Sequence, residues 1–350
     1  MNFQEKILTW FDENRRPFPW RENKEPYSVW LSEIILQQTR ANQGLPYYQS
    51  FISNYPDVRA LANAPEDHVM KLWQGLGYYS RARNLHATAK IISEQYAGEF
   101  PDDFDQIKGL KGIGDYTASA IASICFDQEQ AVVDGNVYRV LSRIFGIDHP
   151  IDSSKAHQYF KAKAQSLMIG ASPGEFNQAM MEFGALQCVP KNPDCEGCPF
   201  KNECLAYKRG KVDLLPIKAK KVKIKNRYFH FFVLVDGAKN TLLEKRHGKG
   251  IWQNLYQFPL IETFKNQKKF TEKELKSLLD QFNVKSDFEL KKWNEQTILH
   301  KLTHQHLEIN FWIVKLSSSE NLSITMDQIS DYPMPKALQN FRDKFFSNRL

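Results

Sequence analysis

Four cysteines gather in one short segment near the middle of the 350-residue chain. They are Cys188, Cys195, Cys198 and Cys204, with the spacing C-x6-C-x2-C-x5-C. Four thiolates so close along the chain can bind structural zinc or an iron–sulfur cluster, or can pair as disulfides. Zinc sites usually combine two short pairs, whereas this segment has one pair with a longer gap on each side. The sequence therefore predicts a metal or cluster site of open identity, and predicts that Cys125 is a core residue.

Two carboxylates, Glu33 and Asp134, have surroundings that suit acid and electrostatic roles. Glu33 shares a helical face with tryptophan and isoleucine, and burial there raises a carboxyl pKa, as a general acid near neutral pH needs. A glutamate at the rim of an apolar stripe fits the same pattern. Asp134 precedes Gly135 and fits a helix N-cap, where a carboxylate can also face a cationic transition state. One protonated and one ionised carboxylate together suit the cleavage of a glycosidic bond.

The segment Leu110–Ala118 has two glycines, Gly112 and Gly114, between apolar helical runs. Glycines permit a sharp turn that leaves backbone N–H groups free at the start of the next helix, and such groups bind phosphate without reading bases. We expect a helix-hairpin-helix motif over about 108–122, with Lys111 in the turn as a phosphate contact. Glycine pairs also close ordinary helix pairs, but the flanking apolar helices strengthen the DNA-binding interpretation.

Taken together, these motifs resemble the MutY family of adenine DNA glycosylases, within the endonuclease III superfamily. The segments that carry the resemblance are Ser32–Thr39, Trp73–Asn84, the glycine hairpin, Asp134–Val137 and the cysteine loop over 188–204. The resemblance implies two helical subdomains with DNA between them, and a target adenine flipped out of the duplex into a pocket. It also implies a [4Fe–4S] cluster on the four cysteines and a MutT-like (Nudix-like) C-terminal domain.

The resemblance further implies catalytic roles. Glu33 would protonate the adenine and later help to activate water, and Asp134 would stabilise the sugar cation or add to it. Tyr116 and Asn136 match residues that position the sugar and Asp134. Endonuclease III has a lysine at the position of Tyr116, and that amine attacks the sugar and leads to strand cleavage. The resemblance therefore implies a monofunctional glycosylase that leaves an abasic site.

Residues that contact the DNA are implied in the same way. Gln37, Gln38 and Tyr78 would fill the space left by the flipped base, although each could instead pack within the protein. The loop His300–His306 matches the family's 8-oxoguanine recognition loop. Here it carries Leu302, Thr303 and His304, where family members commonly have Phe-Ser-His. The C-terminal part lacks the clustered glutamates of Nudix hydrolases, so nucleotide hydrolysis is not expected there.

Three regions must position these residues. Residues 1–207 read as a nearly all-helical catalytic domain, 208–227 as a basic linker, and 228–350 as a smaller α+β lesion-recognition domain. Residues 205–227, just after the cysteine loop, carry a net charge of +8 against +7 for the whole chain, which predicts contact with a polyanion or a solvated linker. In the last region we expect strands at 228–235, 241–246 and 307–316, and helices at 271–282 and 335–346.

The expected function is base excision repair by a monofunctional adenine DNA glycosylase. Its partner would be double-stranded DNA with adenine opposite 8-oxoguanine or guanine. With neither a signal pattern nor an apolar run of about 18 residues, we expect a cytoplasmic monomer, bound at the nucleoid when on DNA, without membrane contact. Three alternatives stay open: a bifunctional endonuclease III-like glycosylase and abasic-site lyase, a non-catalytic damage-binding protein, and a zinc-bearing DNA-binding module.

Overall fold

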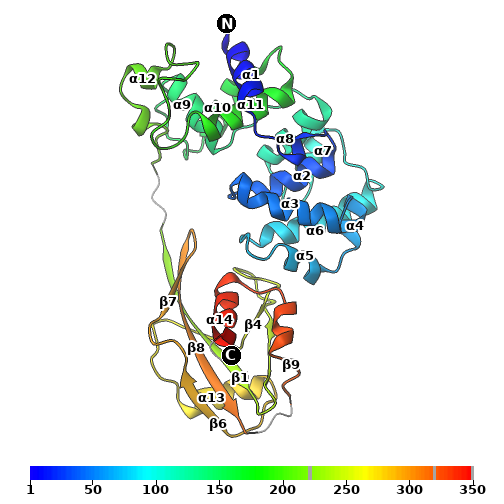
Figure 1. The fold of residues 1–350 in the computed structure, drawn as a ribbon, viewed down its shortest axis with the longest axis vertical. Coiled ribbons are helices and arrows are strands. Elements are labelled where there is room, and N and C mark those ends of the chain that lie inside the picture. The colour runs from blue at the N-terminus through cyan, green and yellow to red at the C-terminus, as the bar shows by residue number, and fades with distance from the viewer. Residues whose placement is uncertain (220–222, 318–320, 348–350) are drawn as a thin grey trace. The chain divides into compact units, whose positions relative to one another are not determined.

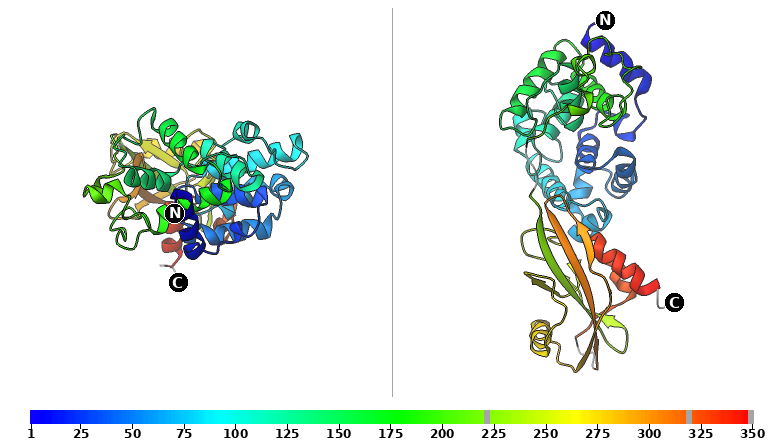
Figure 2. Two further views of the ribbon diagram at one scale, coloured as in Figure 1. Left: turned by 90° about the horizontal axis from the view of Figure 1, so that it is seen from above. Right: turned by 90° about the vertical axis from the view of Figure 1, so that its left-hand side faces the viewer.

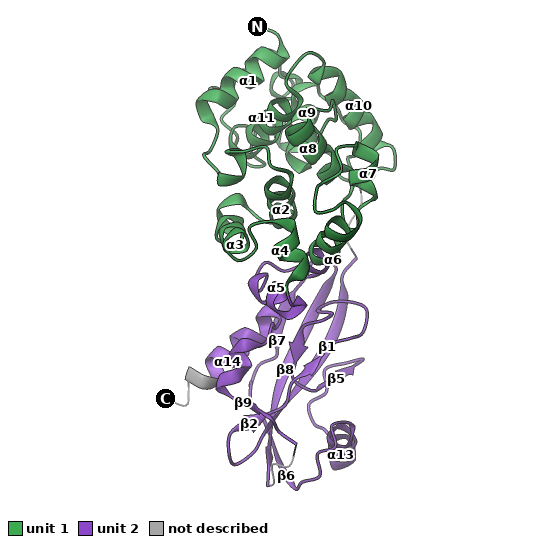
Figure 3. Ribbon diagram, turned by 90° about the vertical axis from the view of Figure 1, so that its right-hand side faces the viewer, with its two compact units in different colours: residues 1–64, 84–220 green, residues 65–83, 221–350 purple. Residues whose placement is uncertain are grey.

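The computed structural model describes residues 1–219, 223–317 and 321–347, and it divides into two compact units. The first unit comprises residues 1–64 and 84–220, and the second comprises 65–83 and 221–350 (Figure 3). The segment 65–83, which the sequence places among the helices, therefore groups with the C-terminal region. The boundary between 207 and 208 and the linker over 208–227 stay predictions, and residues 220–222 of that linker lie outside the described residues.

The first unit consists of helices (Figure 1). Their bounds are α1 (Phe3–Asn14), η1 (Pro19–Arg21), α2 (Pro26–Leu36), α3 (Ala41–Asn54), α4 (Val58–Asn63), α6 (Ser80–Gln95, which starts in the second unit), α7 (Phe104–Gly109), α8 (Asp115–Phe126), α9 (Gly135–Ile144), α10 (Ala156–Met168), α11 (Pro173–Leu186), α12 (Leu205–Lys208) and η2 (Val212–Leu214). One core cluster joins the apolar faces of α1, α9, α10 and α11. Helix α11 also packs against α8, and α8 in turn packs against α2.

The predicted helix-hairpin-helix is present as α7, a short turn and α8. The side chain of Asp103 caps α7 by accepting a hydrogen bond from the Gln106 N–H. Gly112 has a φ of +78° in the turn, and a Cβ atom there would lie 2.6 Å from the Cβ of Asn84, so both conformation and space favour glycine. The hairpin is thus fixed against α6 and directs the start of α8.

The second unit is built on a five-stranded sheet of order β5-β1-β8-β6, with β7 also paired to β8. Its strands are β1 (Lys225–Val235), β5 (Leu260–Thr263), β6 (Phe288–Lys292), β7 (Ile298–Lys301) and β8 (Gln305–Leu316). Strands β1 and β8 run parallel and side by side along the sheet (Figure 2). The helices of this unit are α5 (Glu66–Leu72), α13 (Glu272–Gln281), η3 (Asp327–Asp331) and α14 (Lys336–Ser347). Three sequence-based predictions are confirmed here: strands over 228–235 and 307–316, and the Thr271–Glu274 capping box that opens α13.

The predicted strand over Thr241–Arg246 is wrong as a partner for β1. Instead, β2 (Asn240–Thr241) pairs with β9 (Ile324–Thr325), and β3 (Glu244–Lys245) pairs with β4 (Tyr256–Gln257). The Asp236 carboxylate accepts hydrogen bonds from the backbone and side chain of Asn240, which turns the chain before a long hairpin can form. Both edges of β1 are occupied by β5 and β8, segments distant in sequence, which local patterns do not reveal.

Across residues 1–219, 223–317 and 321–347, no helix combines the length and the apolar character that a bilayer crossing requires.

Candidate active site

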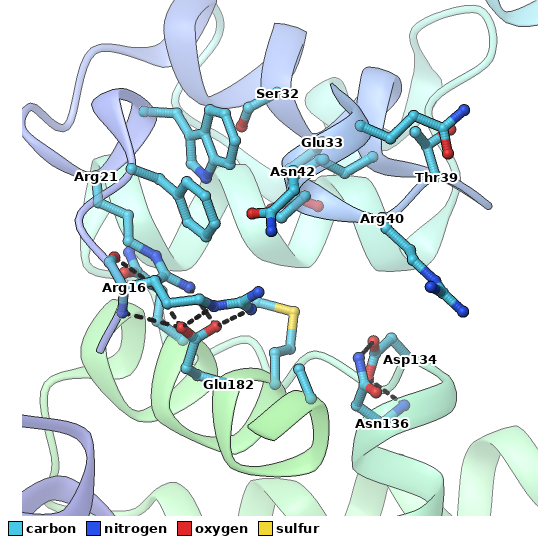
Figure 4. A pocket seen from close by; sticks show the side chains of 18 of the residues that line it. Arg16, Arg21, Ser32, Glu33, Thr39, Arg40, Asn42, Asp134, Asn136 and Glu182 are labelled. Atoms are coloured by element: carbon cyan, nitrogen blue, oxygen red, sulfur yellow. Dashed lines mark hydrogen bonds and ion pairs between the residues drawn. The ribbon is translucent and has the colours of Figure 1, made fainter. Parts of the chain in front are cut away.

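A cavity of about 1060 Å³ opens in the first unit and is lined by all four predicted catalytic residues. Glu33 enters from α2, Tyr116 from α8, and Asp134 and Asn136 from the start of α9. Figure 4 shows Glu33 and Asp134 approaching the cavity from opposite walls. Gln38 also lines it, with a left-handed φ of 58° just after α2 ends. Four catalytic candidates from three sequence motifs therefore share one cavity.

Glu33 is a buried carboxyl group with one strong hydrogen bond. Its side chain lies on a helix whose residues Tyr27–Ile35 are all buried, and Glu33 itself is only 8% exposed. The phenol of Tyr116 donates a hydrogen bond to Glu33 Oε2 at 2.6 Å. Burial raises the pKa of Glu33 from 4.5 to about 7, the Tyr116 hydrogen bond opposes this rise, and the nearby Asp134 charge adds to it. Glu33 can therefore hold a proton near neutral pH.

Asp134 is the N-cap of α9, as the sequence predicts. Its Oδ1 accepts hydrogen bonds from the N–H groups of Asn136 at 2.9 Å and Val137 at 2.8 Å, and Oδ2 accepts one from Asn136 Nδ2 at 2.7 Å (Figure 4). Burial raises the pKa of Asp134, and these hydrogen bonds oppose the rise. A carboxylate held by three donors has a fixed orientation, and its ionised form is favoured over that of an unsupported buried acid.

Tyr116 lies where the sequence comparison with endonuclease III expects a lysine. Burial raises its pKa well above the ordinary value, so the phenol keeps its proton. The same hydroxyl lies 3.4 Å from the sulfur of Met181, on the facing helix α11. Tyr116 therefore acts as a neutral hydrogen-bond donor between α2 and α11 rather than as a nucleophile.

An ion-pair cluster on the pocket wall was missed by sequence reasoning. Arg16 binds Glu182 through Nε and Nη2, each at 2.7 Å, and Arg21 binds it at 2.9 and 3.2 Å (Figure 4). Glu182 is 2% exposed; burial alone would raise its pKa, but the two guanidinium groups lower it to about 2. The arginines and the glutamate lie more than 160 residues apart in sequence, and no local pattern links them.

Arg139 connects the surroundings of Asp134 to the cysteine loop. From α9, its guanidinium donates to the carbonyl of Cys188 at 2.7 Å, to Asn136 Oδ1 at 2.8 Å and to the carbonyl of Gly184 at 2.5 Å. Asn136 in turn holds the Asp134 carboxylate. A continuous series of hydrogen bonds thus runs from the first cysteine of the loop to the pocket.

The four predicted ligand cysteines line one small cavity beside α9 and α11. All four are free thiols rather than disulfides, and Arg143 lies 3.5 Å from Cys188 Sγ while donating to the carbonyls of Val189 and Pro190. In the described part of the chain, no group of three or more His, Cys, Asp or Glu side chains is arranged to hold a metal ion. The shared cavity and the all-thiol donor set nonetheless match the chemistry of an iron–sulfur cluster. Cys125, by contrast, is half-buried on α8 rather than fully in the core.

The predicted DNA contacts of the first unit divide into two groups. Lys111 lies exposed in the hairpin, and Gly114 caps α8 without any side-chain hydrogen bond, so the helix start offers backbone N–H groups as the motif requires. Gln37 differs, because its side chain donates to Thr117 at 3.2 Å and it does not line the cavity. That contact agrees with the packing alternative for Gln37.

The predicted lesion-recognition residues lie in the second unit. Leu302, Thr303 and His304 form the turn between β7 and β8, closed by the Leu302 N–H bonded to the carbonyl of Gln305. Tyr78, exposed and with a left-handed φ of 48°, places its hydroxyl 2.5 Å from Thr303 Oγ1. The structure therefore brings Tyr78 and the recognition loop together within one unit, although 225 residues separate them in sequence.

Comparisons with known proteins connect this geometry to a family. Residues 31–165 match the HhH-GPD superfamily of base excision DNA repair proteins, and residues 230–344 match the NUDIX domain. An adenine DNA glycosylase of Buchnera aphidicola subsp. Schizaphis graminum is 34% identical over 352 residues, 98% of each chain. One from Mus musculus is 41% identical over 226 residues, covering 61% of this chain and 44% of its own.

A solved structure supports the predicted fold class. A thermostable thymine-DNA glycosylase superposes with a TM-score of 0.55 at 31% identity, covering 59% of this chain and 95% of its own. Together with the two domain matches, this confirms the predicted fold class, a helix-hairpin-helix glycosylase domain followed by a Nudix-like α+β domain. On its near-complete match to a curated relative, the chain belongs to the adenine DNA glycosylase family of the HhH-GPD superfamily.

Proposed function

We propose that this protein removes adenine from double-stranded DNA in which the adenine is mispaired with 8-oxoguanine or guanine, and leaves an abasic site. One observation carries the proposal: Glu33, with a pKa of about 7, shares a cavity with Asp134, a carboxylate held by three hydrogen bonds. One group can give a proton to a departing base while the other stabilises the positive charge on the sugar.

The Tyr116 hydrogen bond supports different tasks for the two oxygens of Glu33. Tyr116 occupies Oε2, so Oε1 is the oxygen free to carry a proton to a ring nitrogen of the flipped adenine. As the glycosidic bond breaks, the electron pair stays with the protonated base and a cation develops at the sugar. Asp134, fixed by Asn136 and Val137, faces that cation or adds to it. Glu33, now ionised, then takes a proton from the water that attacks the sugar carbon.

A monofunctional reaction is part of the proposal. Among the described residues that line the cavity none is a lysine, and the phenol of Tyr116 stays protonated. An amine able to form a Schiff base with the sugar is therefore lacking from the residues that line the pocket. The bifunctional alternative would need an amine from elsewhere.

Cys188, Cys195, Cys198 and Cys204 are proposed to hold a [4Fe–4S] cluster. Such a cluster would supply a rigid cross-link of the loop, since hydrolysis of a base transfers no electrons. The protein side of that role is the bond from Arg139 to the Cys188 carbonyl, which ties the loop to the N-terminus of α9. The ordering of the loop would thereby support the position of Asp134.

Recognition of the opposite base is proposed for the second unit. Thr303 keeps a hydroxyl in the turn between β7 and β8 and lies beside Tyr78, a side chain exposed enough to enter a duplex. A threonine-to-alanine change at 303 should lower the preference for 8-oxoguanine over guanine opposite the adenine. We further propose that the protein acts as a monomer in the cytoplasm, on chromosomal DNA.

The identity of the base that the protein releases distinguishes these proposals. Duplexes with adenine opposite 8-oxoguanine, adenine opposite guanine, and thymine opposite guanine are incubated with excess enzyme, and free bases are identified by mass spectrometry. We expect adenine from the first two duplexes, no thymine from the third, and no covalent adduct after borohydride treatment. Release of thymine would contradict the proposed specificity for adenine, and a trapped adduct would move the protein to the bifunctional class. No free base at all would favour a damage-binding protein.

A further inference from the structure

Helix α11 contains two glycines that lie directly against other backbones. A Cβ atom on Gly174 would lie 2.8 Å from the Ile124 Cα on α8. A Cβ atom on Gly184 would lie 2.5 Å from the Asn136 Cβ and 3.0 Å from its carbonyl carbon and Cα. The 2.8 Å and 2.5 Å distances are too short for carbon atoms that are not bonded to each other. Each glycine therefore marks a place where α11 contacts its neighbour without a side chain between them.

Space, and not backbone conformation, accounts for glycine at position 184. Gly184 is buried within a regular helix and has no left-handed φ. Alanine is the better helix former at such a position, because glycine loses more backbone freedom on folding. Alanine at 184 would therefore suit α11 itself, and the contact with Asn136 opposes it.

The residue that Gly184 contacts, Asn136, holds the carboxylate of Asp134. Asn136 donates its backbone N–H to Asp134 Oδ1 and its Nδ2 to Asp134 Oδ2. The Gly184 carbonyl and Asn136 Oδ1 both accept from Nη2 of Arg139. Moving α11 away from Asn136, or pushing Asn136 aside, thus disturbs the donors that orient the Asp134 carboxylate.

We propose that Gly184 is a positioning residue for base excision: the lack of a side chain there lets α11 hold Asn136, and through it Asp134, in the reactive orientation. The proposal rests on the proposed function for its kinetic consequence but not for its geometry. Gly174 provides a matched control, since its Cβ would also lie closer than 3.0 Å to a neighbouring atom, at 2.8 Å, but that atom is on α8 rather than in the Asp134 turn.

The test compares Gly184→Ala with Gly174→Ala. In single-turnover reactions on duplexes with adenine opposite 8-oxoguanine, we expect Gly184→Ala to lower the excision rate constant at least tenfold relative to Gly174→Ala, since a displacement of about 1 Å can cost about a hundredfold. DNA affinity and thermal midpoint should change alike in the two variants. Equal rate constants would overturn the proposal.

A titration of Asp134 distinguishes a positioning role of Gly184 from a purely structural one. Hydrogen bonds from Asn136 lower the pKa of Asp134, so weakening them should raise it. With ¹³C-labelled aspartate, and Asp134→Asn to assign the signal, the carboxyl midpoint should move to higher pH in Gly184→Ala and stay in place in Gly174→Ala. An unmoved or lowered midpoint in Gly184→Ala contradicts the proposal.

The test also covers an inactive unmutated protein and a Gly184→Ala variant that does not fold. If the unmutated protein releases no adenine, the proposed function fails, and the titration alone decides the role of Gly184. If Gly184→Ala does not fold, the variant Gly184→Ala with Asn136→Gly removes the nearest colliding atom. Recovery of folding in that double variant supports the contact as the cause, and continued failure refutes it.

Discussion

The buried acid Glu33 should make the protein less stable as the pH rises. Its pKa is about 7 in the folded protein and 4.5 as its ordinary value, so between these pH values the folded state binds a proton that the unfolded chain has released. Below pH 4.5 the titration of Glu33 therefore does not lower the free energy of unfolding. The cost grows as the pH rises toward 7 and is complete above it, at about 3 kcal/mol given 1.36 kcal/mol per pH unit.

Replacing Glu33 by glutamine should remove this cost along with the activity. Glutamine keeps a carbonyl oxygen that can accept from Tyr116, so the packing of the site is preserved. At pH 8 we expect Glu33→Gln to be more stable than the unmutated protein by about 3 kcal/mol, and at pH 4.5 to be about equal. The difference should develop mainly between those pH values.

Urea denaturation of the two proteins at intervals from pH 4.5 to 8 measures this difference. Unfolding is monitored with a signal from the helical unit, because the two units need not unfold together. Glu13→Gln, at an exposed position on α1, controls for the loss of one negative charge and should give a flat difference. A flat difference for Glu33→Gln, or destabilisation at pH 8, would refute the assignment of Glu33 as an acid kept protonated by burial.

Three further predictions follow from the same contacts. Tyr116→Phe removes the hydrogen bond that lowers the pKa of Glu33, so the alkaline limb of the single-turnover pH–rate profile should move to higher pH; an unmoved limb would contradict that role. Glu182→Gln leaves Arg16 and Arg21 with an uncharged partner and should destabilise the protein by about 3 kcal/mol in urea denaturation, with a change below about 1 kcal/mol counting against it. Cys198→Ser should abolish iron–sulfur absorbance and weaken DNA binding in a titration; full retention of both would dismiss the cluster proposal.

The sequence was most informative where function depends on local patterns. Helical spacing beside tryptophan and isoleucine offered two positions for Glu33, buried or at the rim of an apolar stripe, and the structure shows the buried one. The Asp134-Gly135 step predicted an N-cap, which is present. The hairpin glycines and the grouping of the cysteines also follow from short spacings. Such features need only a few neighbouring residues, and neighbouring residues are what a sequence displays directly.

Features made by distant segments were not predictable in the same way. Glu182 reads as an ordinary helical residue until the fold brings Arg16 and Arg21 to it. The expected strand over 241–246 failed because β1 takes its partners from segments far along the chain. A collision distance such as that at Gly184 depends on the packing of two helices, so only the structure reveals it.

The most direct test of the central claim is single-turnover cleavage of a duplex with adenine opposite 8-oxoguanine, analysed on denaturing gels before and after alkali. If Glu33 and Asp134 excise adenine while Tyr116 leaves the sugar intact, strand breaks appear only after alkali, and Glu33→Gln produces none. Breaks without alkali would show lyase activity, and equal cleavage by Glu33→Gln would contradict the role of Glu33 as the acid.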